Sequence, residues 1–242
     1  MWLTCLVSLV LLVSSFAQAQ NQLTEIDLEH IRQATVRQYI SEQQDRHIKC
    51  FSDLHPSVVQ NDALDDFRQY EKVYLIKESV HEVWANYKYA SQTDVWEINR
   101  VSFGMAFCRD SEEVVYADEL LFGMEVGQIY FLNLKILHGL YNLPVAFEVT
   151  TVDRERRLFE FSYLKGGKAE GKQSIQLMET PQGYTEIVHK SFVRSDSKFR
   201  DKYLYPFFHN KLIREFHSNM RRIITYNAKN PRLAQAGLAV DK

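Results

Sequence analysis

The sequence predicts an α+β protein in which a curved antiparallel sheet wraps around one long C-terminal helix. Three observations predict this fold. Residues 74–87 pass from a strand pattern directly into a capped helix, short β-like runs separated by turns follow, and residues 203–226 have a long amphipathic helical pattern. The chain has 242 residues, 45% of them hydrophobic, which is enough for one sizeable core. We expect one main domain with an extension.

The N-terminus is the first element. It is an apolar run without charged residues that ends in Ala17-Gln18-Ala19, a triplet typical of a signal-peptidase site. We therefore predict a signal peptide over residues 1–19, a protein that is exported to the periplasm or the medium, and no integral membrane span after cleavage. An uncleaved anchor is the alternative, although the run is short for a bilayer.

Residues 20–68 are predicted to form a helical N-terminal extension that lies on the main domain. Residues 23–48 are polar, with apolar residues only loosely at helical spacing, and Thr24 could cap a helix there. Pro56 interrupts the pattern, because proline fixes its own backbone and disfavours helix for the residue before it.

The main domain, residues 69–228, opens with a strand and a short helix. Ser79 and Glu82 have the spacing of a capping box, which predicts a helix that begins at this point. Four apolar residues fall on one face of this helix: Val80, Val83, Trp84 and Tyr87. The helix is therefore expected to bury one side.

The middle of the chain predicts an antiparallel meander. Residues 145–153 and 157–166 read as one hairpin, and residues 171–180 and 184–193 read as a second hairpin across a Pro-Gln-Gly turn. Connections this short join antiparallel neighbours.

The last helix is predicted over residues 203–226, with Pro206 in its first turn, where a missing N–H does no harm. Its apolar stripe faces the sheet and consists of Leu212, Ile213, Phe216, Met220, Ile223 and Ile224. Residues 229–242 follow as a flexible tail, because Pro231 stops the helix and little there could anchor it.

Charge and cysteine content exclude several function classes. The net charge of −2 and the pI near 6.5 give no electrostatic case for nucleic acid or an anionic membrane surface. After cleavage Cys50 and Cys108 would remain, and the bridged and free forms are equally open. His209 and His217, eight residues apart, lack a third ligand. We predict no metal and no cofactor.

The stretch KVYLIKESVHEVWANY, residues 72–87, resembles the first strand and following helix of the START-like and Bet v 1-like (SRPBCC) superfamily, whose architecture is the helix-grip fold. The element order of residues 73–226 is similar as well, and FSYLKGGKAEGKQSIQLME resembles strands of uncharacterised bacterial members. The resemblance implies a cavity between the sheet and the C-terminal helix that holds an apolar or amphipathic small molecule.

The strand patterns suggest residues for such a cavity. Phe159, Phe161 and Tyr163 share one strand face by period two, and His189 and Ser191 share another. With two residues of the final helix, the predicted ligand-binding set is Phe159, Phe161, Tyr163, His189, Ser191, Phe216 and Met220. An aromatic stripe and a lone histidine are also typical of ordinary core packing, and both interpretations stay open.

We predict an exported binding protein for an apolar or amphipathic small molecule. One alternative is an enzyme of the cyclase or hydratase type that uses His189 or Tyr163 as general acid-base. Another is a structural or interaction protein whose groove is filled by its own side chains. No nucleophile beside a base can be assembled from sequence neighbours, so catalytic residues are not assigned.

Overall fold

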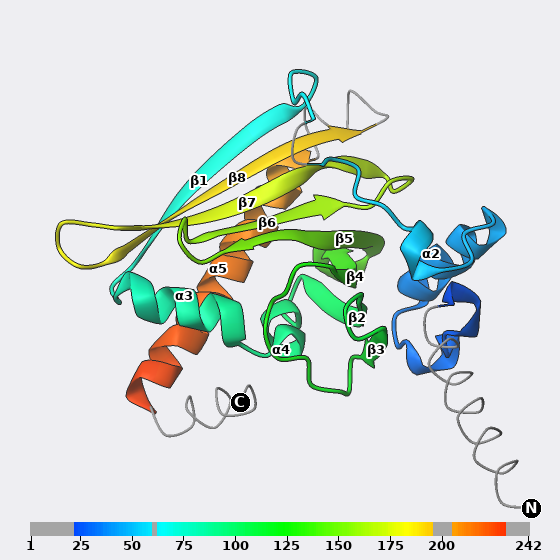
Figure 1. The fold of residues 1–242 in the computed structure, drawn as a ribbon, viewed down its shortest axis with the longest axis horizontal. Helices are drawn as coiled ribbons and strands as arrows, with labels where there is room; N and C mark the ends of the chain where they lie inside the picture. The colour runs from blue at the N-terminus through cyan, green and yellow to red at the C-terminus, as the bar shows by residue number, and fades with distance from the viewer. Residues whose placement is uncertain (1–21, 60–61, 196–204, 231–242) are drawn as a thin grey trace, which may run out of the picture.

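The computed structural model describes residues 22–59, 62–195 and 205–230, and these form one curved antiparallel sheet with a long helix across its inner face (Figure 1). This is the α+β helix-grip architecture predicted from the sequence. The predicted signal peptide and residues 231–242 of the predicted tail lie outside the described residues. No helix in the described ranges is long and apolar enough to cross a membrane.

Eight strands make up the sheet: β1 (Arg68–Ile76), β2 (Val101–Cys108), β3 (Glu113–Tyr116), β4 (Gln128–Ile136), β5 (Tyr141–Asp153), β6 (Leu158–Tyr163), β7 (Ala169–Glu179) and β8 (Thr185–Ser195). The α-helices are α2 (Ala34–Asp45), α3 (Val80–Tyr89), α4 (Gln92–Trp96) and α5 (Tyr205–Lys229). The 3-10 turns are η1 (Leu23–Glu25), η2 (Leu28–His30), η3 (Phe51–Asp53) and η4 (Leu137–Gly139).

The strand order is β1-β8-β7-β6-β5-β4-β2-β3, and every neighbouring pair is antiparallel. The first and last strands along the chain, β1 and β8, are therefore neighbours in the sheet, with Val73 opposite Val188. Both predicted hairpins, β5–β6 and β7–β8, are present. Because α5 follows β8, it crosses the inner face of the strands that precede it (Figure 1).

The predicted strand-to-helix switch is confirmed. Ser79 is the N-cap of α3, and its hydroxyl accepts a hydrogen bond from the Glu82 N–H at 3.2 Å. All four apolar residues predicted for one face are buried: Val80, Val83, Trp84 and Tyr87. The α3 helix packs through them against the sheet, where the ring of Trp84 stacks on Phe159 at 4.3 Å.

The α5 helix is described from Tyr205 and ends at Lys229, three residues beyond the predicted end. Ile213, Phe216, Met220 and Ile224 of its stripe are buried against the inner face of the sheet. The buried side of α5 also carries polar residues: His209, His217 and Asn219. This side of the helix is therefore less apolar than the stripe alone predicted.

The sheet has a second core on its outer face, covered by the N-terminal extension. Leu23, Ile31 and Phe51 are fully buried there, and Phe51 stacks on Phe107 of β2 with 3.9 Å between ring centroids. Arg109 donates to the carbonyl oxygens of Phe51 and Leu54, and it also pairs with Glu148 of β5 at 2.8 Å. The extension is thus fixed by apolar packing and by polar contacts, among them those of Arg109.

The extension differs from the helix expected over residues 23–48. Only Ala34–Asp45 is α-helical, and Gln33 is its N-cap. The expected cap, Thr24, lies inside η1, where its hydroxyl donates to the Gln22 side chain at 3.4 Å. The physical reason is that widely spaced apolar residues must each reach the outer face, which a continuous helix of this polar sequence would not allow.

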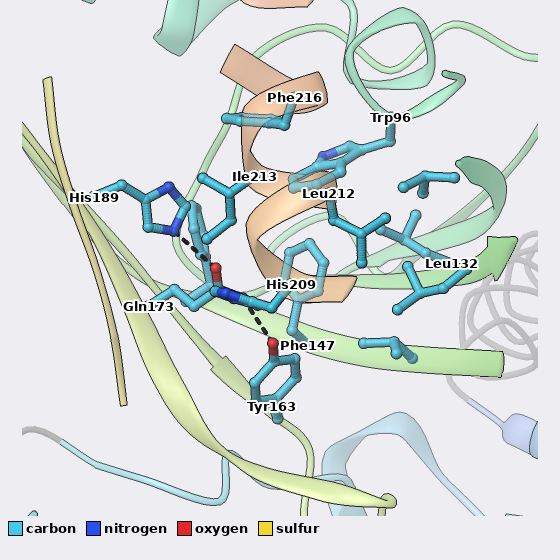
Figure 2. Close-up of a pocket in the computed structure, with 14 residues that line it drawn as sticks. Trp96, Leu132, Phe147, Tyr163, Gln173, His189, His209, Leu212, Ile213 and Phe216 are labelled. Carbon is cyan, nitrogen blue, oxygen red and sulfur yellow. Dashed lines mark hydrogen bonds between the residues drawn. The ribbon is translucent and has the colours of Figure 1, made fainter. Parts of the chain in front are cut away.

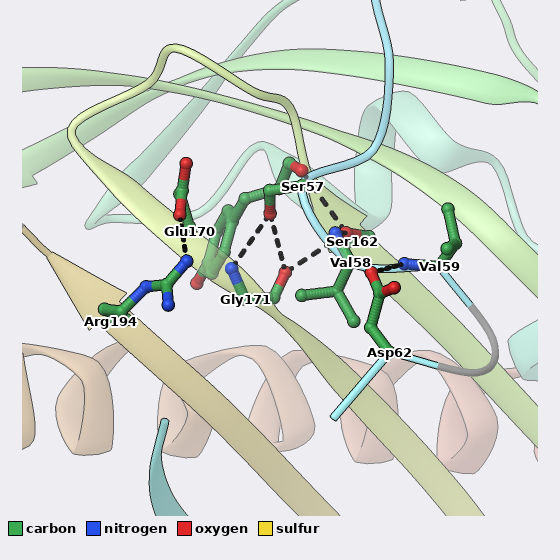
Figure 3. A network of polar contacts seen from close by, with 9 residues as sticks. Ser57, Val58, Val59, Asp62, Ser162, Glu170, Gly171 and Arg194 are labelled. Carbon is green, nitrogen blue, oxygen red and sulfur yellow. Dashed lines mark hydrogen bonds and ion pairs between the residues drawn. The ribbon is translucent and has the colours of Figure 1, made fainter. Parts of the chain in front are cut away.

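A network of polar contacts joins the end of the extension to the sheet (Figure 3). The Ser57 N–H donates to the Tyr163 carbonyl at 2.7 Å, and the Val58 N–H donates to the Ser162 hydroxyl at 3.0 Å. The Gly171 N–H donates to the Ser57 hydroxyl at 3.0 Å. These bonds satisfy backbone donors that would otherwise be unpaired where the chain crosses the sheet.

The two cysteines among the described residues, Cys50 and Cys108, are free thiols. Cys108 packs against the inner core, whereas Cys50 immediately precedes Phe51 in the layer on the outer face. The two thiols therefore belong to opposite sides of the sheet, and no disulfide joins them.

Candidate ligand-binding cavity

A cavity of about 70 Å³ lies between the inner face of the sheet and the first half of α5 (Figure 2). Six strands, α4 and α5 contribute to its wall. The lining residues are Trp96, Val101, Leu132, Leu134, Val145, Phe147, Phe161, Tyr163, Gln173, His189, His209, Leu212, Ile213 and Phe216. None of them carries an Asp, Glu, Lys or Arg side chain, so the wall is apolar with a few neutral polar groups.

Three of these polar groups come from consecutive strands. Tyr163 is on β6, Gln173 on β7 and His189 on β8, and all three face inward because they share the inner side of the pleat. The Gln173 amide donates to the Tyr163 hydroxyl oxygen at 2.8 Å, and its carbonyl oxygen lies 2.8 Å from Nε2 of His189 (Figure 2).

The hydrogen-bonded row continues into the interior. Nδ1 of His189 lies 2.8 Å from Nε2 of His217 on α5, and Nδ1 of His217 lies 2.7 Å from the Tyr87 hydroxyl on α3. Five side chains thus form one chain from the cavity to the core: Tyr163, Gln173, His189, His217 and Tyr87. We call this set the polar row. It joins three strands to two helices.

Burial sets the protonation of the histidines. Desolvation lowers the pKa of His189 from 6.5 to about 3, and it likewise lowers the pKa of His209 to about 3. Burial and the neighbouring His189 hold the pKa of His217 well below its ordinary value. Burial also raises the pKa of the Tyr87 hydroxyl well above 10. The polar row is therefore uncharged at neutral pH.

One cavity residue has a buried donor without an acceptor. The indole Nε1 of Trp96 has no hydrogen-bond partner among the described residues, while its ring stacks on Phe216 at 4.7 Å. An indole N–H can only donate. A buried donor left without an acceptor costs about 1–3 kcal/mol. The Trp96 N–H is therefore a position where an acceptor would be stabilised.

The structure brings together four of the seven residues predicted for ligand binding. Phe161, Tyr163, His189 and Phe216 line the cavity. Phe159, Ser191 and Met220 do not: Phe159 packs under Trp84, Met220 lies in the inner core, and Ser191 is buried on β8. These three residues lie away from this cavity, and ligand binding by the predicted set stays a prediction.

Several lining residues were not predicted. Gln173 had a signal, because it is the polar member of a strand face shared with Ile175 and Leu177. His209 is on the buried side of α5, but Trp96 ends a five-residue helix with no pattern of its own. Only the fold places Trp96 at the cavity.

The histidines do not form a metal site. His189 on β8 is a third histidine beside His209 and His217 on α5. Nδ1 of His189 and Nε2 of His217 face each other, but both nitrogens are occupied by the hydrogen bond between them. Within the described ranges no group of three or more His, Cys, Asp or Glu residues could hold a metal ion.

No protein-family model matches the chain, and no curated protein matches it in sequence. Solved structures match it in shape. Norcoclaurine synthase of Thalictrum flavum, a point mutant with a transition-state analogue, is 13% identical over 67% of this chain and 96% of that chain, with a TM-score of 0.48. A conserved protein from Geobacillus kaustophilus is 15% identical over 66% and 97%, with a TM-score of 0.47. A protein from Nitrosospira multiformis is 11% identical over 67% and 99%, with a TM-score of 0.43.

The fold assignment rests on the chain's own topology. A strand is followed by two short helices, seven further strands complete one antiparallel sheet, and a long final helix crosses its inner face. This element order and strand order give the chain the helix-grip fold.

Proposed function

We propose that the protein binds an apolar or amphipathic small molecule in the cavity between the sheet and α5. The observation that carries this proposal is that Tyr163, Gln173 and His189 meet at a wall that is otherwise apolar. An apolar enclosure with a few convergent polar groups is what a small-molecule site requires. Apolar contacts would supply affinity, and the polar groups would orient the guest.

The size of the cavity limits the guest. Its volume of about 70 Å³ is smaller than the roughly 300–1,000 Å³ of pockets for drug-sized ligands. We therefore expect a small guest, such as a single ring or a short chain. A larger molecule would require the wall to move.

Binding is favoured over acid-base catalysis by the state of His189. A general base needs a pKa near the working pH, and burial lowers the pKa of His189 to about 3. Both of its ring nitrogens also lie in hydrogen bonds, to Gln173 and His217. These bonds suit a group that positions a guest.

Native mass spectrometry of the protein purified from its own host tests the proposal. We expect a discrete small molecule near one-to-one stoichiometry, which solvent extraction would release. Val145→Phe, which fills the cavity, should abolish this occupancy, whereas Val73→Phe on the exposed side of β1 should not. A wild-type protein of the bare polypeptide mass would contradict the binding function.

We also propose that the protein is exported. The support is the uncharged apolar run that ends at Ala19, which lies outside the described residues. The mass of the protein isolated from its host tests this, since cleavage predicts a chain that begins at Gln20. Retention of residues 1–19 would indicate an anchor instead.

A further inference from the structure

We propose that two copies of the chain associate through β1, which pairs antiparallel with β1 of the second copy in a register centred on Tyr74. The proposal concerns the edge of the sheet and does not depend on the binding function. Three features support it: the length and exposure of this edge strand, its apolar side chains on the outer face, and the symmetry of its charges about Tyr74.

The two edges of the sheet differ. Among the described strands, β1 and β3 each pair with one neighbour only, and β3 is a four-residue strand whose Val114 and Tyr116 pack against the core of the outer layer. β1 is nine residues long, contains no proline or glycine, forms one margin of the sheet (Figure 1) and has six exposed residues. The N–H and C=O groups along an edge can pair with another chain, so edge strands are usually short, covered or interrupted. β1 is long, exposed and regular, which leaves it open to a further strand.

β1 also carries exposed apolar side chains on the outer face of the sheet. Val73 is 52% exposed and Leu75 is 50% exposed. Tyr74 and Ile76 alternate with them and pack in the inner core, so Val73 and Leu75 point the other way. Val188 of β8 lies opposite Val73 on the same face. A strand added beside β1 would remove part of this apolar surface from water.

The side chains of β1 are arranged symmetrically about Tyr74. When two identical strands pair antiparallel about a two-fold axis, positions equally far before and after the central residue lie opposite each other. With Tyr74 at the centre, Val73 lies opposite Leu75 of the second copy, and Glu71 lies opposite Lys77, the exposed residue that directly follows the strand. Each pair occurs twice, so apolar side chains meet and opposite charges meet.

Other registers of the same strand are less favourable. An axis through Lys72 would place two lysines opposite each other, and an axis through Glu71 would do the same with two glutamates. Like charges directly opposite are destabilising. An axis through Val73 would set Glu71 against Leu75. Because the charge pattern of β1 complements itself, the partner that fits this edge best is a second copy of the chain.

The existing ion pair of Glu71 does not compete strongly with this association. Glu71 lies 3.4 Å from Nζ of Lys190 on β8, and the two side chains are 45% and 43% exposed. Water and salt screen such a pair, so it contributes little. Glu71 can therefore bind Lys77 of a second copy in place of Lys190 or together with it.

Analytical ultracentrifugation from micromolar to near-millimolar protein tests the association. We expect a reversible equilibrium in which the mass approaches twice that of the chain, because a two-fold pair of edges closes at two copies. A chain that stays monomeric over this range would overturn the proposal. Growth into assemblies larger than a dimer would also contradict it.

A charge exchange tests the register. Glu71→Lys and Lys77→Glu each place like charges opposite at two points, and each alone should weaken association about tenfold. In an equimolar mixture of the two variants both charge pairs again have opposite signs, so association should return close to the wild-type level. A mixture that associates no better than either variant alone would overturn the register centred on Tyr74.

Glu113→Lys on β3 is the matched control, because it makes the same change of charge at an exposed residue of the other edge. We expect it to associate like the wild type. An equal loss in Glu113→Lys and Glu71→Lys would show an effect of net charge and would contradict a specific contact at β1. Circular dichroism spectra that match the wild type confirm that the variants are folded.

Discussion

Nδ1 of His189 and Nε2 of His217 lie 2.8 Å apart, so the two buried imidazoles share a single hydrogen-bonding proton. If both rings were protonated, two donors would face each other across this gap. Among the residues that the structure describes, no carboxylate forms a hydrogen bond with either ring, whose other partners are Gln173 and Tyr87. The folded state therefore holds both rings neutral, which makes the stability of the fold depend on pH.

We expect the free energy of unfolding to decrease as the pH falls below about 6.5. In the unfolded chain the histidines take up protons near their ordinary pKa of 6.5, whereas burial keeps the folded pKa of His189 and of His209 near 3 and lowers that of His217. The unfolded state binds more protons, so stability rises with pH and is fully present above about 6.5. Each buried histidine contributes up to about 1.4 kcal/mol per pH unit.

Urea unfolding between pH 7 and 5 measures this dependence. His217→Gln should reduce the slope by the contribution of one histidine, and His81→Gln, at an exposed position on α3, should leave it unchanged. A wild-type stability that does not vary over this range would show that the histidines are not held neutral.

Arg109→Met should loosen the extension from the outer face of the sheet. The substitution leaves the carbonyls of Phe51 and Leu54 without their donor and Glu148, which is largely buried, without its partner. We expect the free energy of unfolding to fall by about 2 kcal/mol. This loss is smaller than that for a fully buried ion pair, because the Arg109 side chain is partly exposed. Proteolysis within residues 22–59 should also become faster.

Arg156→Met is the matched control for this variant. Arg156 pairs with Asp153 in an exposed turn, where water and salt screen the pair and it contributes little to stability. Equal effects of the two substitutions would argue against a specific role of Arg109 in fixing the extension.

Gly171→Ala should be strongly destabilising. Gly171 has a φ of +138°, and an added Cβ would lie 1.9 Å from the carbonyl oxygen of Phe192 on β8. The β7–β8 pairing must shift to relieve this contact, with a loss of about 2 kcal/mol or more in thermal or urea unfolding. Gly167→Ala is the control, because its nearest atoms are at 3.4 Å, and near-wild-type stability is expected.

Cys108 should react slowly with alkylating reagents in the folded protein. Burial, followed by the charge of Glu113, raises the pKa of its thiol to about 11. At pH 8 the reactive thiolate is then about one part in a thousand of the thiol. Peptide mass spectrometry after iodoacetamide treatment measures the rate, and denaturant should accelerate it. Alkylation of folded Cys108 at the rate of an unfolded thiol would refute this prediction.

Local patterns predicted most of the main domain. The capping residue and apolar face of α3, the two hairpins and the stripe of α5 each depend on neighbours within a few residues, so the sequence contains the whole signal. The extension was predicted less well. Its turns are set by where Leu23, Ile31 and Phe51 meet the outer face, and that face is built by strands far along the chain.

At the candidate site, too, the sequence predicted local features but not contacts between elements that are distant along the chain. Period-two patterns predicted that Phe161 and Tyr163 share a face and that His189 points to the same side as Ile187. They could not predict that His189 meets His217, because that contact depends on how α5 crosses the sheet. Phe159 had the correct face but lies under Trp84, since position along a strand is not encoded in its period.

The N-terminal segment on the outer face of the sheet is synthesised before the surface that it covers. Residues 23–54 leave the ribosome before any strand of the sheet, yet the surface that they cover includes Phe107, Ile129 and Ala146 of β2, β4 and β5. Their apolar side chains have no place to dock until β5 has been made. Until then a nascent chain carries the apolar side chains of residues 23–54 exposed.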